Sequence, residues 1–77
     1  MDGLSDLTLQ GRVVRDSTNE IQIYSGEYWK KQVVDFRWYQ NDKPTKKGIR
    51  MNMEEAKRVH MVLTRILHEA DIDVEMD

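Results

Sequence analysis

The chain has 77 residues, no cysteine and a formal net charge of -2. This length holds a single domain, and the lack of cysteine excludes a disulfide framework and a thiolate metal site. The sequence contains no apolar run long enough for a membrane span and no signal-peptide pattern at its start, so we expect a protein of the cytoplasm or nucleus. Because so short a chain buries little surface as a monomer, self-association is also expected.

Charge is distributed unevenly along the chain. Residues 30–50 include seven cations and two anions, a local charge of +5, whereas residues 69–77 include five anions and no lysine or arginine. The middle of the chain is therefore suited to a polyanion, and residues 71–77 are predicted to form an acidic tail that would repel one.

Four short segments predict an antiparallel sheet over residues 8–51, after a loose segment at 1–7. The first strand, LTLQGRVVRD, contains Gly11, which indicates a bulge or bend. The second and third, EIQIYSGEYW and KQVVDFRWYQ, both alternate, the third most clearly, and are joined by a hairpin tip at residues 29–31. The segment NDKP is predicted to be a loop, and KKGIRM a short fourth strand.

Alternation also assigns side chains to the two faces of the sheet. On the third strand Val34, Phe36 and Trp38 share one face, which we expect the helix to cover. The other face is expected to be free and to carry Tyr24, Tyr28, Arg37, Tyr39 and Arg50.

A single helix is predicted over residues 52–70. Asn52 is its N-cap, and Glu55 three residues later completes a capping box. The apolar stripe of the helix is wider than is required to cover four short strands. Part of it is therefore expected to contact a second copy of the chain. The residues expected at this dimer interface are Val59, Val62, Leu63, Ile66 and Leu67. The segment DIDVEMD then alternates, and we favour a tail over a fifth strand.

Few residues suit catalysis or metal binding. His60 and His68 are eight residues apart, so on a helix they lie about two turns apart and cannot share a metal within one subunit. Asp35 and Arg37 resemble the acid-x-base pairing of some nucleases but lack a second acidic ligand nearby. We therefore expect no enzyme activity, no metal and no cofactor.

Cations and aromatic residues interleave in the middle of the chain. Single-stranded nucleic acids are bound by cations that follow phosphates and by rings that stack on bases. Trp29, at the hairpin tip, has little core to enter, whereas Trp38 has inward parity and is expected in the core unless it lies at the sheet edge. A solvated charged face is the alternative. The predicted nucleic-acid-binding residues are Tyr28, Trp29, Lys30, Lys31, Arg37, Trp38, Tyr39, Lys43, Lys46, Lys47 and Arg50.

The segments KQVVDFRWYQ and KPTKKGIRMNMEEA resemble the transcriptional positive-cofactor family of single-stranded-DNA-binding coactivators. Members typically show V-D-I-R followed by aromatics, a loop, [KR]-K-G-I, and a polar cap that opens a helix. The corresponding elements here are residues 34–37, 38–39 and 46–49, and Asn52 with Glu54 and Glu55. The resemblance covers residues 20–67, and the compact form is more similar to bacterial or bacteriophage members than to animal ones.

The resemblance implies a strongly curved four-stranded sheet and one helix, with dimerisation mainly through the helices. It also implies channels for single-stranded or unwound DNA, little sequence preference and no catalytic activity. By position, the implied contacts are Tyr28 and Lys31 at the tip, Arg37 on the strand, and Lys46 and Lys47 before Gly48. The chain departs from the family at Gln40, where many members have a further aromatic, and at the tip, where many have a glycine.

The resulting hypothesis is a homodimeric, sequence-tolerant single-stranded-DNA-binding protein. It would act like a coactivator in transcription, replication or repair, in the cytoplasm of a bacterium or phage-infected host, or in a eukaryotic nucleus. One alternative is an adaptor that contacts RNA polymerase or other transcription proteins through its acidic tail. The other is an RNA-binding protein, because the contact that distinguishes RNA from DNA is to the 2′-hydroxyl.

Overall fold

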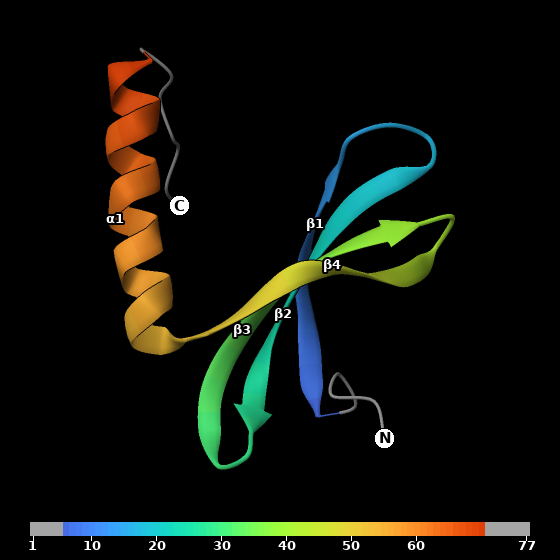
Figure 1. Ribbon diagram of the computed structural model, residues 1–77, viewed down its shortest axis with the longest axis horizontal. Coiled ribbons are helices and arrows are strands. Elements are labelled where there is room, and N and C mark those ends of the chain that lie inside the picture. The colour runs from blue at the N-terminus through green and yellow to red at the C-terminus, as the bar shows by residue number, and fades with distance from the viewer. Residues whose placement is uncertain (1–5, 71–77) are drawn as a thin grey trace.

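The computed structural model describes residues 6–70, which form one antiparallel sheet followed by one helix (Figure 1). The elements are β1 (Leu7–Val14), β2 (Asn19–Tyr28), β3 (Lys31–Gln40), β4 (Lys43–Asn52) and α1 (Met53–Glu69). The sheet is open, with strand order β1-β2-β3-β4, so every strand pairs with its neighbour in sequence. The predicted meander and C-terminal helix are confirmed. The predicted loose segment, apart from residues 6 and 7, and the acidic tail lie outside the described residues.

Two-residue turns join β2 to β3 and β3 to β4. Their central residues, Trp29 and Lys30 in the first turn and Asn41 and Asp42 in the second, all have positive φ, between 51° and 66°. This is the geometry of type I′ turns, whose twist matches that of the flanking strands. The prediction of a four-residue loop at NDKP was wrong, because β4 already begins at Lys43. The proline that follows is tolerated because β4 is an edge strand, where a missing N–H leaves no ladder bond unmade.

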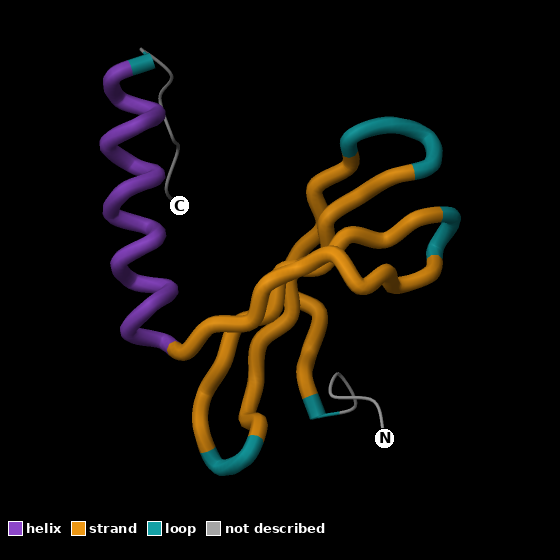
Figure 2. The backbone as a smooth tube through the Cα atoms, viewed as in Figure 1, coloured by secondary structure: helices purple, strands orange, loops and turns teal. Residues whose placement is uncertain are grey.

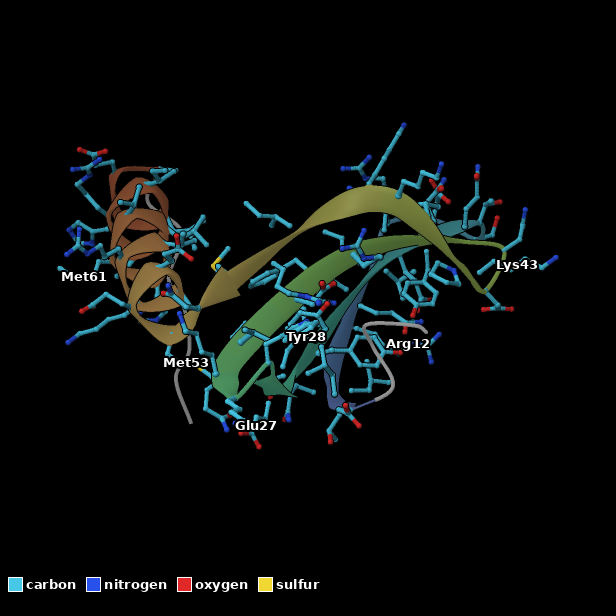
Figure 3. The ribbon with its side chains drawn as sticks, turned by 60° about the horizontal axis from the view of Figure 1, so that its bottom comes forward. Arg12, Glu27, Tyr28, Lys43, Met53 and Met61 are labelled. Carbon is cyan, nitrogen blue, oxygen red and sulfur yellow. The ribbon has the colours of Figure 1, made fainter. Side chains whose placement is uncertain are left out.

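Two bulges bend the sheet. The pairing of β1 with β2 shifts register between Leu9 and Gly11, which confirms the predicted bulge at Gly11. The pairing of β3 with β4 shifts between Arg37 and Tyr39, opposite the segment 45–47. Bulges increase the local twist and bend of a strand. Figure 3 shows the result, a sheet that arches, with the labelled Tyr28 and Arg12 on its inner side.

The concave face of this arch is the more buried one. Asp35 has no exposed surface, Tyr39 is 8% exposed and Gln22 is 9% exposed. All three lie on the face that the sequence predicted to be free. Side chains inside an arch converge and cover one another, whereas side chains on the convex face diverge. Phe36 and Trp38, which were expected to be inside, accordingly lie half-buried on the convex face.

The helix does not cover the sheet. α1 stands beside it and contacts only β3 and β4, where the chain leaves the sheet (Figure 2). Its start follows the predicted capping box: the Glu55 N–H donates to Asn52 Oδ1 at 2.8 Å, and the Asn52 N–H donates to Glu55 Oε1 at 2.9 Å. None of its residues is buried, so the expectation that α1 packs on the apolar face of the sheet was wrong. No helix within residues 6–70 is long and apolar enough to cross a membrane.

Candidate nucleic-acid interface

The predicted binding residues lie in three parts of the sheet. The β2–β3 turn, which we call the hairpin tip, is formed by Tyr28, Trp29, Lys30 and Lys31. The concave face includes Arg37, Tyr39 and Arg50. The opposite end of the sheet, which we call the loop end, includes Trp38, Lys43, Lys46 and Lys47. Because β2 and β3 are each ten residues long, the two ends lie roughly 30 Å apart along the strands.

The hairpin tip presents one free aromatic ring. Trp29 is 81% exposed, between the exposed Lys30 and the ring of Tyr28, which it meets edge-on at 6.0 Å between centroids. Tyr28 is itself covered by Arg50, whose Cζ lies 4.4 Å from the ring centroid. Trp29 is therefore available to a ligand, and Tyr28 supports it from the side.

The backbone of the tip is held in an unfavourable conformation. Trp29 has φ of 54° and Lys30 has φ of 64°. Positive φ is uncommon in residues other than glycine, asparagine and aspartate, and such positions cluster at binding sites. A type I′ turn favours Asn-Gly. A tryptophan and a lysine in these places are therefore less favourable for the turn than Asn-Gly.

The two strand arginines are held by a buried carboxylate. Arg37 donates to Asp35 from Nε and from Nη2, each at 3.2 Å, and Arg50 donates to the same carboxylate from Nε at 3.0 Å. Arg37 also donates from Nη1 to the carbonyl of Thr45 at 3.3 Å. Two guanidiniums on the concave face therefore share this one buried carboxylate. In the free protein both arginines therefore have a structural role, because each holds the buried Asp35 carboxylate.

A second polar network fills the rest of the concave face. Tyr39 Oη donates to Tyr24 Oη at 3.3 Å, Tyr24 Oη donates to Gln22 Oε1 at 2.8 Å, and Gln22 Nε2 donates to Glu20 Oε2. The network ends in the pair of Arg12 with Glu20, with two hydrogen bonds of 2.8 Å. The hydrogen bond from Arg12, more than that from Gln22, lowers the pKa of Glu20 below its ordinary value. Tyr39 is thus a buried member of this network.

A groove of about 500 Å³ opens at the loop end. It is lined by Arg15, Asn19, Trp38, Gln40, Thr45, Lys46 and Lys47. The Thr45 hydroxyl donates to the Trp38 carbonyl at 2.8 Å and accepts from the Lys47 N–H at 3.1 Å, so it holds the bulge of β4 against β3. These bonds place two lysines beside a tryptophan ring. Lys43 lies outside the groove, at the end of the β3–β4 turn (Figure 3).

Gly48 lets β4 pass close to β3 beside this groove. A Cβ at this position would lie 2.8 Å from Arg37 Cζ and would also meet the Phe36 carbonyl oxygen. Gly48 therefore permits a close approach of the two backbones that a larger residue would prevent. The same region of the convex face is apolar, with a smaller hollow lined by residues including Ile21, Phe36 and Ile49.

Arg15 was missed by the sequence analysis. Its Cζ lies 4.3 Å from the centroid of the Trp38 ring, so it completes the groove with a third cation. The only signal in the sequence was a cation directly before the turn at 17–19. Nothing in the spacing indicated that this turn meets residue 38, because the two are brought together only by the pairing of β2 with β3.

No protein-family model matches the chain, and no curated protein or solved structure matches it. Within residues 6–70, no three histidine, cysteine, aspartate or glutamate side chains lie close enough to hold a metal ion. What the described surface does offer is two separate places where a tryptophan ring and exposed lysines lie together. Lysine ammonium groups can pair with phosphates, and tryptophan rings can stack on bases.

Proposed function

We propose that the protein is a homodimeric, sequence-tolerant single-stranded-DNA-binding protein with a coactivator-like role in transcription, replication or repair. One observation supports this most: each end of the sheet combines a tryptophan ring with exposed lysines. At the hairpin tip these are Trp29 and Lys30, and at the loop end they are Trp38, Lys46 and Lys47. Rings stack on bases and ammonium groups neutralise phosphates, so each end carries the two residue types used in single-strand binding.

Single strands fit this surface better than duplex. A protein ring can stack on a base only when one face of that base is not covered by a neighbouring base. Exposing a base in a duplex costs on the order of a few kcal/mol. Two ends about 30 Å apart suit an extended strand that touches both. Binding should tolerate many sequences, because every base has a π-face.

The helix supports the proposed dimer. Val59, Val62, Leu63 and Ile66 are between 39% and 50% exposed. Leu67, the fifth residue predicted at this interface, is half-buried. An exposed apolar stripe of this kind is typical of protein interaction sites. A second copy of the chain would cover the stripe and would bring two sets of cationic ends into one particle. The resemblance of residues 20–67 to the positive-cofactor coactivators supports the same arrangement.

The direct test is fluorescence anisotropy with labelled oligonucleotides at two salt concentrations. We expect tighter binding to single-stranded DNA than to duplex of the same length, with affinity that falls steeply as salt rises. Replacement of Lys46 and Lys47 by alanine should weaken binding to all sequences alike and flatten the salt dependence. A matched control replaces Lys57 and Arg58, two exposed cations of α1, and should leave binding unchanged.

Two outcomes would redirect the proposal. Tighter binding to RNA than to DNA of the same sequence would favour the RNA-binding alternative. No binding to any nucleic acid at low salt would refute the proposal and favour an adaptor that contacts other proteins.

A further inference from the structure

In the groove at the loop end, the ring on which a base could stack is already covered. The guanidinium of Arg15 lies over Trp38, with Cζ 4.3 Å from the ring centroid. Lys46 and Lys47 line the same groove, and so do the side chains of Asn19 and Gln40, which face each other across β2 and β3. A volume of about 500 Å³ is within the range of small-ligand sites, roughly 300–1,000 Å³.

The backbone that carries Arg15 is firmly held. The Asp16 carboxylate accepts hydrogen bonds from the N–H groups of Thr18 and Asn19 at 2.9 and 2.8 Å, and these bonds lower the pKa of Asp16. The Arg15 N–H donates to the Asn19 carbonyl at 3.0 Å. The Asn41 N–H donates to the Thr18 carbonyl at 2.9 Å, which ties the β1–β2 loop to the β3–β4 turn. The walls of the groove are therefore preorganised.

The side chain of Arg15 is held much less firmly than its backbone. Within residues 6–70, its guanidinium makes no hydrogen bond or ion pair; it lies over the ring of Trp38 and is also attracted by the neighbouring Asp16 carboxylate, without an ion-pair contact. A cation over a ring at an exposed site is worth less than a base stacked on that ring. A base can therefore displace the guanidinium, which remains attached at the rim of the groove, within reach of that nucleotide's phosphate.

We propose that this groove is a subsite for one unstacked nucleotide, with Arg15 as an exchangeable cover. In the free protein Arg15 covers Trp38. On binding, the base takes the place of Arg15 on the ring, and Arg15 moves to the phosphate, opposite Lys46 and Lys47. This inference rests on the proposed function and adds to it a positioning residue and a defined place for one base.

The test follows the emission of Trp38 alone. The variant Trp29→Phe removes the only other tryptophan, so that quenching by unlabelled oligothymidylate reports stacking on Trp38. Anisotropy with labelled oligothymidylate, measured over a range of salt, gives affinity and salt slope for the same protein. We expect saturating oligothymidylate to quench Trp38.

Three further variants in the Trp29→Phe background isolate the role of Arg15. Arg15→Gln should lower affinity and reduce the salt slope by about 0.7, the value for one phosphate contact of a single strand, while quenching at saturation persists. Arg15→Lys keeps the charge and should keep the slope. Arg58→Gln removes an exposed guanidinium of α1, outside the groove, and should change neither quantity.

The outcomes separate this inference from the proposed function. Salt-dependent binding without quenching of Trp38 would overturn the subsite and leave single-strand binding intact. Quenching with an unchanged slope in Arg15→Gln would overturn the exchange of Arg15 from ring to phosphate. Absence of binding by the parent protein would overturn both.

Discussion

Replacement of Asp35 by alanine is expected to cost more stability than any other single change in the sheet. The carboxylate has no exposed surface and binds two guanidiniums, those of Arg37 and Arg50, through three hydrogen bonds of 3.0–3.2 Å. Removal of one partner from a buried ion pair costs about 3–5 kcal/mol, because the remaining charge stays unpaired. The two arginine side chains are 20% and 27% exposed, so water can reach them in part. We therefore expect a loss near the lower limit, about 3 kcal/mol.

That loss is large for a chain of this size. At about 0.05–0.15 kcal/mol per residue, a domain of 77 residues has a total stability of roughly 4–12 kcal/mol. Urea unfolding followed by circular dichroism measures the change. Asp35→Asn keeps the shape and one acceptor oxygen, so comparison with alanine separates the charge from the hydrogen bonds. Asp42→Asn removes a carboxylate from an exposed turn that suits asparagine, and should be neutral. A loss below about 1 kcal/mol for Asp35→Ala would refute the reasoning, because it is too small for the breaking of a buried ion pair.

Four further predictions concern other parts of the molecule. Gly48→Ala should destabilise the protein by about 1–3 kcal/mol, because β3 leaves no space for a Cβ, and an unchanged urea midpoint would contradict this. The double variant Trp29→Asn, Lys30→Gly should stabilise the type I′ turn by about 1–2 kcal/mol and yet weaken single-strand binding; binding equal to the parent protein would show that no base stacks at the tip. The pKa of Glu20 is lowered from 4.5 by Arg12, so its contribution to stability is complete above pH 4.5 and is lost as the pH falls through the folded-state pKa. Glu20→Gln should accordingly flatten the pH dependence of the unfolding midpoint below pH 4.5. The same pH dependence in the variant and the parent protein would show that the Arg12–Glu20 pair does not contribute to stability. Leu63→Glu should convert the proposed dimer to a monomer in sedimentation equilibrium, and a monomeric parent protein would exclude the interface.

The local elements of the fold could be read from short stretches of sequence. The capping box of Asn52 and Glu55 involves residues three apart, and the alternation of β2 and β3 repeats every two residues. The bulge at Gly11 was likewise visible, because a glycine inside a strand pattern is itself the signal. Each of these features is determined by neighbours in the chain, so no knowledge of the remaining structure was required. Lys43 and Pro44 are the exception, because a proline is tolerated in a strand only at the edge of a sheet, and position in the sheet is a tertiary property.

The candidate site could be predicted only in part, for the same reason. The sequence alone indicated cations and aromatic residues as candidates and predicted the exposed tip at Trp29, where a hairpin turn leaves little core to enter. Only the tertiary structure assigned Arg37 and Arg50 to the buried carboxylate of Asp35, since alternation gives the parity of a face but not its curvature. The arch made the polar face the inner one and left Trp38 on the outer one. Strand pairing then brought Arg15 onto that ring from 23 positions away in sequence, a contact that no local pattern encodes.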